Sequence, residues 1–119
     1  MTTLKMFRGD DRTINLRFTK SGVVQDITDW MIFFTAKRNL ADTDTQAIMQ
    51  KNNITMSDIL ITNGPQGLAT VAILPTDTSS LEDSELALTC DVQVRDANGI
   101  VSTTGYIHLL VLPDVTRAT

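Results

Sequence analysis

The pattern that most constrains the fold lies in the last third of the chain. From Leu86 to Arg95, apolar residues alternate strictly with polar or small residues, and a second apolar-rich run ends at Leu112. Between the two runs stand Asn98 and Gly99, a pair that favours the positive backbone angles of a tight hairpin turn. Because alternation with period two is typical of a strand with one buried face, the sequence predicts a β-hairpin over residues 86–112.

The same signals predict more strands upstream. Alternation favours a half-buried strand, whereas a run rich in aromatic and β-branched residues favours a central strand. Strands are expected at residues 12–18, 30–38, 58–62 and 68–74, the second of them central. Residues 39–51 fit two interpretations, a polar loop followed by a weak strand or a short helix over 40–50, and both stay open.

The segment before the final hairpin interrupts the strand pattern. Thr78 or Ser79 could cap a helix, Glu82 follows at about capping-box distance, and Leu81 could point into a core. We therefore expect one short helical turn near residues 77–83.

These elements together predict the fold class. The chain has 119 residues and a mass of 13.1 kDa, which is enough for one hydrophobic core without cross-links. Short strands, turns between them, a single helical turn and no internal repeat predict an all-β chain, an immunoglobulin-like antiparallel β-sandwich. We expect residues 1–119 to form one such domain.

Composition narrows the classes of partner. The formal net charge of −4 disfavours nucleic acid, which is bound largely through Lys and Arg. No run is long and apolar enough for a secretory signal or a membrane span, so we expect synthesis in a cytoplasm and no membrane partner. Residues 1–20 are mainly basic and residues 74–96 mainly acidic. These segments predict either two patches that steer head-to-tail contacts or simply two solvated faces.

Residues for catalysis or metal binding are scarce. His108 is the only histidine, so neither a two-histidine metal site nor a relay with a spare histidine can form. Cys90, the only cysteine, falls on the apolar face of the 86–95 strand and is expected to be inert core. We therefore expect no enzyme, no cofactor and no metal site.

Candidate contacts with other proteins come from exposed or alternating positions. A stripe of alternating residues near the C-terminus would be exposed if the second face of its strand meets solvent, or covered if the sandwich or a loop lies over it. The candidates are Arg8, Arg12 and Arg17 in the basic segment, Asp42 and Asp44 in the 39–51 loop, and the stripe Tyr106, His108 and Leu110.

Several fragments resemble a known family in their order and spacing. They are Phe7-Arg-Gly-Asp10, Ile14-Asn-Leu16, Gly22-Val-Val-Gln-Asp-Ile-Thr28, Gly67-Leu-Ala-Thr-Val-Ala-Ile73, Asp77-Thr-Ser-Ser-Leu81, Cys90-Asp-Val-Gln-Val-Arg-Asp-Ala-Asn-Gly99, Gly105-Tyr-Ile-His-Leu-Leu-Val111 and Asp114-Val-Thr116. This layout resembles the small N-terminal β-sandwich domain of phage baseplate upper proteins. The resemblance implies a structural component of a virion, docked on other tail or baseplate proteins and acting through protein-protein contacts, with homo-oligomers as one form of assembly. It implies no catalytic residues.

A second function remains open beside this one. A small β-sandwich could instead bind a carbohydrate or a receptor, as decoration proteins and adhesins do. Sugar sites usually need exposed aromatic rings, and the chain has one Trp, one Tyr and four Phe, most of them on apolar faces.

Overall fold

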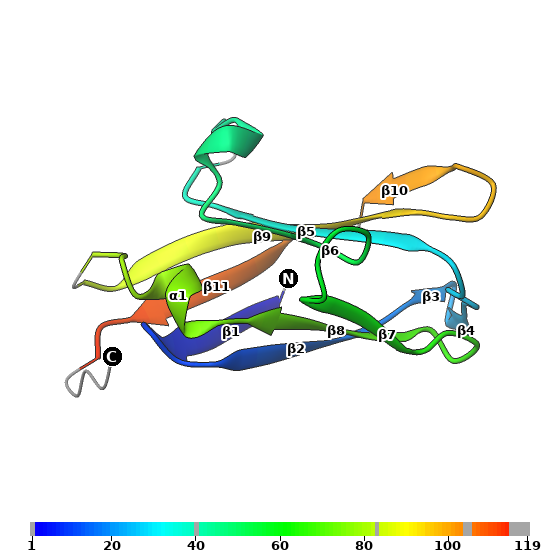
Figure 1. The fold of residues 1–119 in the computed structure, drawn as a ribbon, viewed down its shortest axis with the longest axis horizontal. Coiled ribbons are helices and arrows are strands. Elements are labelled where there is room, and N and C mark those ends of the chain that lie inside the picture. Colours follow the sequence, from blue (N-terminus) through cyan, green and yellow to red (C-terminus); the bar gives the residue numbers. More distant parts are fainter. Residues whose placement is uncertain (1, 40, 83, 104–105, 115–119) are drawn as a thin grey trace.

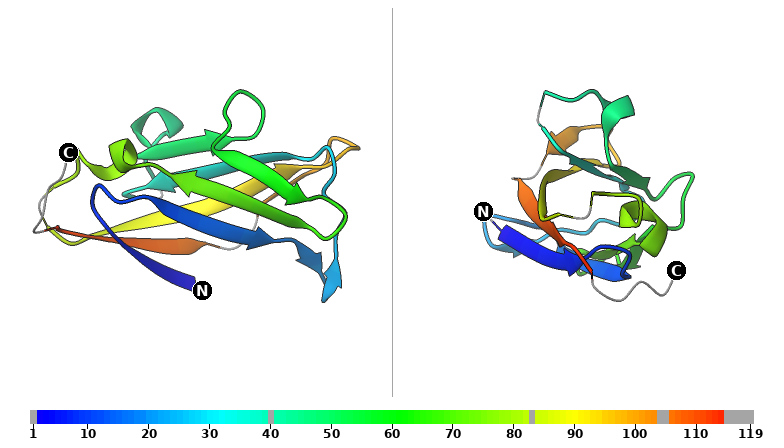
Figure 2. Two further views of the ribbon diagram at one scale, coloured as in Figure 1. Left: turned by 60° about the horizontal axis from the view of Figure 1, so that its bottom comes forward. Right: turned by 90° about the vertical axis from the view of Figure 1, so that its left-hand side faces the viewer.

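The alternating segments of the sequence form the strands of two packed sheets in the computed structural model, which describes residues 2–39, 41–82, 84–103 and 106–114 (Figures 1 and 2). The strands of the larger sheet are β1 (Thr2–Phe7), β5 (Met31–Lys37), β6 (Met49–Asn52), β9 (Leu86–Arg95), β10 (Val101–Thr103) and β11 (Ile107–Leu112). Their order is β1-β11-β9-β5-β6, and β10 also pairs with β9.

The smaller sheet covers one face of the larger. Its strands are β2 (Arg12–Arg17), β7 (Ile59–Asn63) and β8 (Leu68–Ile73), in the order β2-β8-β7. A separate short pair, β3 (Thr19–Lys20) and β4 (Val23–Val24), forms a β-ribbon at one end.

The connectivity is that of an immunoglobulin-like sandwich. In immunoglobulin domains strands B, E and D form one sheet and strands C, F and G the other, with C′ added in variable-type domains. Taken in chain order, β2-β8-β7 corresponds to B-E-D and β11-β9-β5-β6 to G-F-C-C′. The predicted β-sandwich is therefore confirmed. Its pairs are antiparallel except for β1, which runs parallel to β11 with Leu4 opposite Leu109.

The core lies between the sheets because each strand turns its alternate apolar residues inward. Phe34, Val92 and Leu109 are almost wholly buried on the larger sheet, and Ile14 and Val71 face them from the smaller one. Antibody domains join the counterparts of β2 and β9 with a disulfide. Here Cys90 on β9 is a free, buried thiol within the apolar core between the sheets.

The final hairpin is as predicted at its turn. Arg95 pairs with Val101, the Asp96 carboxylate accepts the N–H groups of Asn98 and Ile100, and Gly99 has a φ of +81°. Only glycine adopts such an angle without strain, which is why the Asn-Gly pair marks the turn.

The helical turn lies earlier than predicted. Helix α1 spans Pro75–Thr78, whereas the expected range was 77–83, of which residue 83 lies outside the described residues. Pro75 suits the first helical position, and the Asp77 carboxylate accepts the Leu74 N–H at 2.7 Å. Thr78 ends the helix instead of capping its start. Its buried hydroxyl accepts the Gly9 N–H at 2.8 Å and so ties α1 to the β1–β2 turn.

The ambiguous segment resolves mostly toward loop and strand. A three-residue 3-10 helix, η1 (Asp44–Gln46), precedes β6, so the helix considered over residues 40–50 is limited to these three described residues. Leu40 lies outside the described part of the chain. In Figure 1, η1 projects from the outer side of the larger sheet.

Candidate binding surfaces

A groove of about 530 Å³ lies on the outer face of the larger sheet, the face turned away from the core. Its floor is built by strand alternation, because Ile32, Phe34 and Ala36 point inward and the residues between them point outward. The outward pairs across β5 and β9 are Phe33 with Gln93, Thr35 with Asp91, and Lys37 with Thr89.

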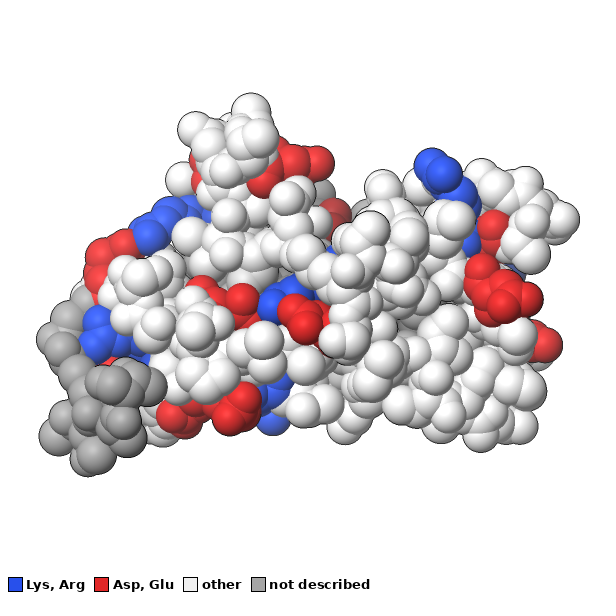
Figure 3. Space-filling model, viewed as in Figure 1, with Lys and Arg blue, Asp and Glu red and all other residues white. Residues whose placement is uncertain are grey.

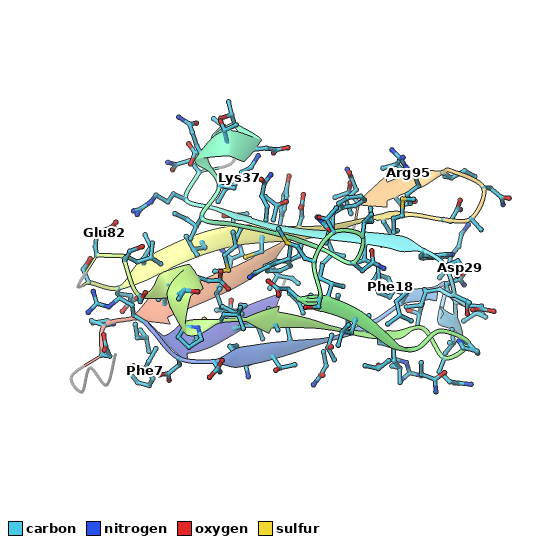
Figure 4. The ribbon with its side chains drawn as sticks, viewed as in Figure 1. Phe7, Phe18, Asp29, Lys37, Glu82 and Arg95 are labelled. Carbon is cyan, nitrogen blue, oxygen red and sulfur yellow. The ribbon has the colours of Figure 1, made fainter. Side chains whose placement is uncertain are left out.

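Two loops and one aromatic residue form the walls of the groove. The Lys37 ammonium lies 2.9 Å from an Asp44 carboxylate oxygen and also donates to the Asp42 carbonyl, which fastens the η1 segment to β5. On the other side, the Asn52 side-chain oxygen accepts the N–H groups of Ile54 and Thr55 and so fixes the turn that carries Met56. Tyr106, 45% exposed, completes the lining. Figure 4 shows Lys37 at one end of this face and Arg95 at the other.

Asp91 is the ionisable group on the groove floor. Burial raises the pKa of its carboxyl, and the negative charge of Asp44 raises it further, while the Lys37 ammonium opposes both. The Asp91 carboxylate makes no hydrogen bond to another described residue. It therefore keeps its capacity to accept hydrogen bonds from a ligand.

A second surface lies at the β1 edge of the same sheet. Phe7 is 50% exposed and pairs with Leu112, and Lys5 is exposed and pairs with Leu110. With half-buried His108, these residues form the edge patch: Lys5, Phe7, His108, Leu110 and Leu112. The outer edge of β1 has no neighbouring strand among the described residues (Figure 2).

The predicted contact residues are distributed over different environments. Tyr106 and Asp44 line the groove, Asp42 holds its wall through a backbone carbonyl, and His108 and Leu110 belong to the edge patch. The stripe over residues 106–110 therefore meets solvent on its second face, which was one of the two open alternatives. Its members are divided between the groove and the edge patch, which adjoin where His108 pairs with Thr89.

The three predicted arginines do not form one exposed patch. Arg8 is only 9% exposed: its guanidinium bonds the Asp114 carboxylate at 3.0 Å and the Leu81 carbonyl at 2.8 Å. Its role as an exposed contact is therefore corrected to that of an internal clamp. Arg12 is half-buried, with its Nε atom enclosed, and only Arg17 is exposed.

Three of the charges considered for head-to-tail patches are paired within the chain: Arg8 with Asp114, Asp77 with Lys51, and Glu82 with Arg38. Buried Lys51 bonds Asp58 and Asp77, both at 2.7 Å, and Arg38 bonds Glu82. Burial alone would lower the pKa of Lys51, but its two carboxylate partners outweigh burial and raise it. Figure 3 accordingly shows acidic and basic groups interspersed on the face it displays. That the remaining charges steer head-to-tail contacts stays a prediction.

Phe33, Asp91, Lys5 and Phe7 were not among the predicted site residues. The alternation of β5 could have indicated Phe33, because Phe33 and Phe34 must face opposite sides of one strand. Asp91 has the same signal, as it alternates with buried Cys90 and Val92. That Phe33 and Asp91 share a groove follows only from the pairing of β5 with β9.

The described residues offer neither a metal-binding cluster nor a membrane-spanning helix. Within the described ranges, no His, Cys, Asp and Glu side chains gather in a group of three that could hold a metal ion. Nor does any described helix have the length and apolar character needed to cross a membrane.

Comparison with known proteins adds a similarity of shape. No protein-family model matches the chain, and no curated protein matches it in sequence. The structure of murine CRIg is similar over 93% of this chain and 92% of that one, with 12% sequence identity and a TM-score of 0.45. A likeness at this level carries no conclusion about function, so the groove and the edge patch are interpreted from their own chemistry.

Proposed function

We propose that the chain is a non-enzymatic structural module of a phage tail or baseplate, or of a similar particle, that docks on other proteins of that particle through the edge patch. The observation that carries the proposal is the outer edge of β1, which no other described strand pairs with, and exposed Phe7 beside it. An extended segment of a partner can add to such an edge through main-chain hydrogen bonds, and its alternate side chains would then meet the patch.

The composition of the edge patch suits this kind of contact. Phe7, Leu110 and Leu112 supply apolar surface, while Lys5 and His108 supply polar groups at its border. Interfaces commonly combine an apolar centre that contains an aromatic residue with a polar rim. Figure 4 shows Phe7 at the periphery of the sandwich, where a partner can reach it. The layout resemblance to baseplate proteins supports the assignment to a particle.

The proposal is tested by asking whether the chain enters particles through this surface. Particles would be purified on a density gradient from cells that express the tagged chain with its neighbouring genes, and probed for the tag. Phe7→Lys should abolish co-sedimentation. Leu60→Lys, on β7 of the other sheet, is the matched control, since Leu60 is 54% exposed and Phe7 50%.

Each outcome bears on a different part of the proposal. Wild-type chain missing from the particles would reject the structural role, and normal incorporation of Phe7→Lys would reject the edge patch. Sedimentation velocity of the purified chain at low and moderate salt asks separately whether it forms a closed oligomer. Salt should have little effect on any self-association, because apolar contacts are hardly screened.

A further inference from the structure

Two hollows on the described surface differ in the polar groups they leave free. The second hollow, of about 620 Å³, lies beside Trp30. Its Asn53 side chain is occupied within the fold, since it accepts the Ile32 N–H at 2.8 Å and donates to the Trp30 carbonyl at 2.9 Å. The groove over β5, β6 and β9 keeps four polar side chains available, those of Thr35, Gln50, Thr89 and Asp91, so it is the stronger candidate for a ligand site.

We propose that the groove binds a neutral sugar unit of a glycan. Its volume of about 530 Å³ falls in the ordinary range for small-ligand sites. The groove lining shares no residue with the edge patch, so each proposal can be tested without the other.

The polar side chains of the groove suit a ligand rich in hydroxyl groups. Thr35, Thr89, Gln50 and Asp91 all line it, and none of these side chains bonds another described residue. Hydroxyls and amides both donate and accept hydrogen bonds, and a carboxylate accepts from two hydroxyls at once. Sugar hydroxyls, which also donate and accept, match this mixture.

Strand geometry holds these groups in fixed positions. Thr35 lies opposite Gln50 on β6 and opposite Asp91 on β9, so these three side chains stand in one row across the sheet. Groups carried on paired strands are placed more exactly than groups on loops, and less conformational entropy is lost when a ligand binds them.

The apolar lining complements the ring faces of a sugar. Phe33 rises from the floor, and Tyr106 and Met56 stand at the sides. Aromatic rings offer apolar surface to the C–H faces of a saccharide, and the Tyr106 hydroxyl adds one polar group. The requirement for an accessible aromatic residue, which the sequence left open, is met by Tyr106 at 45% exposure.

Charge favours a neutral sugar over an acidic one. Asp44 and Asp91 place two carboxylates on the groove, whereas its Lys37 ammonium is already bonded to Asp44. A carboxylated sugar would therefore be repelled. A Lys or Arg side chain of a protein partner is a poorer match, because it only donates hydrogen bonds and would leave the donors of Thr35, Thr89 and Gln50 without acceptors.

Nuclear magnetic resonance of the labelled chain tests the site directly. Tyr106 is the only tyrosine and Trp30 the only tryptophan, so their ring signals report on the groove and on the other hollow without ambiguity. The probes are glucose, galactose, mannose, N-acetylglucosamine and disaccharides of each. Glucuronic acid and trilysine serve as acidic and basic comparisons.

We expect at least one neutral saccharide to shift the Tyr106 ring and the Gln50 side-chain amide saturably while the Trp30 signal stays in place. Asp91→Asn should weaken binding about tenfold, as expected for loss of a charged hydrogen-bond acceptor. Asp11→Asn makes the same chemical change at an exposed position outside the groove lining and should leave affinity unchanged. Amide spectra of both variants confirm that they are folded.

Several results would overturn the proposal. One is a Tyr106 ring signal that stays in place with every neutral sugar up to about 20 mM, well above a dissociation constant of ~1 mM for a weak ligand. The others are an Asp91→Asn variant that binds the sugar as tightly as wild type, glucuronic acid that binds as tightly as the neutral sugars, and trilysine that binds in the groove in their place. Phe7→Lys should keep full sugar affinity. A sugar titration without binding would reject the sugar site but not the proposed particle role. Failure of the chain to enter particles would reject that role but not the sugar site.

Discussion

Lys51→Met should destabilise the fold strongly, because Lys51 joins the two sheets at their β6 side. Its ammonium lies 2.7 Å from carboxylate oxygens of Asp58 and Asp77, and its side chain is 5% exposed. Met has similar length and fills the same space without the charge. The variant therefore removes the ion pairs and leaves two carboxylates facing each other, with little change in packing.

The size of the effect follows from how buried the three groups are. Breaking a buried ion pair costs about 3–5 kcal/mol, mostly from the charge left behind. Asp58 and Asp77 keep 23% and 19% side-chain exposure, so water recovers part of that cost and we expect about 3 kcal/mol. For 119 residues the unfolding entropy is about 0.25 kcal/mol per kelvin, so the melting temperature should fall by ~12 °C.

Urea unfolding and thermal melts followed by circular dichroism measure this loss. The pKa of folded Lys51 is raised, so its contribution is fully present below the unfolded value of about 10.4 and disappears as pH rises through the folded value. The difference between wild type and Lys51→Met should therefore be constant near neutral pH and shrink above pH ~10.4.

A compensated variant separates the charge effect from packing. Adding Asp58→Asn and Asp77→Asn to Lys51→Met removes the unpaired charges, and the amide oxygen introduced at position 77 could still accept the Leu74 N–H. This variant should recover at least about half of the lost stability. A single Lys51→Met variant within about 0.5 kcal/mol of wild type, or no recovery in the triple variant, would refute the reasoning.

The remaining predictions concern the Arg8 clamp and the buried thiol. Arg8→Ala should lower the free energy of unfolding in urea by about 2–3 kcal/mol, since it leaves Asp114 and the Leu81 carbonyl without this partner. The control, Arg17→Ala at an exposed position, should change that free energy by less than about 0.5 kcal/mol. Equal effects of the two substitutions would contradict the role of Arg8 as an internal clamp. Burial first, and then the charge of Asp91, raise the pKa of the Cys90 thiol to about 12. A thiol reagent at about pH 8 should therefore leave native Cys90 unmodified and react fully only in guanidinium chloride, and rapid reaction of the native chain would show that β9 opens.

The strands could be predicted because a strand with one buried face alternates apolar and polar residues along its sequence. Leu88, Cys90, Val92 and Val94 are all buried, as their spacing requires, and the Asn98-Gly99 turn forms where its backbone preferences place it. The predicted helical turn was placed too late because Thr78 and Glu82 have the spacing of a capping box, whereas the helix in fact begins at Pro75 with Asp77 in its first turn.

The candidate site was predicted only in part, for a different physical reason. Alternation assigns a residue to a face, but it does not say which strand lies next to it. Tyr106 and Asp44 were foreseen as exposed, yet they line a groove only because β9 pairs with β5 and the η1 segment folds back over Lys37. Arg8 was foreseen as exposed because its partner Asp114 lies 106 positions away.

The period of the strands, the position of the final turn and therefore the β-sandwich class follow from the order of the amino acids alone, because these depend on neighbours within a few residues. Folding in three dimensions was needed to establish which charges are paired, which strands lie at the edges of the sheets and which outward side chains share a groove. Those properties depend on contacts between distant segments, as in Lys51 with Asp77 or Thr35 with Asp91, and local sequence preferences carry no information about such pairings.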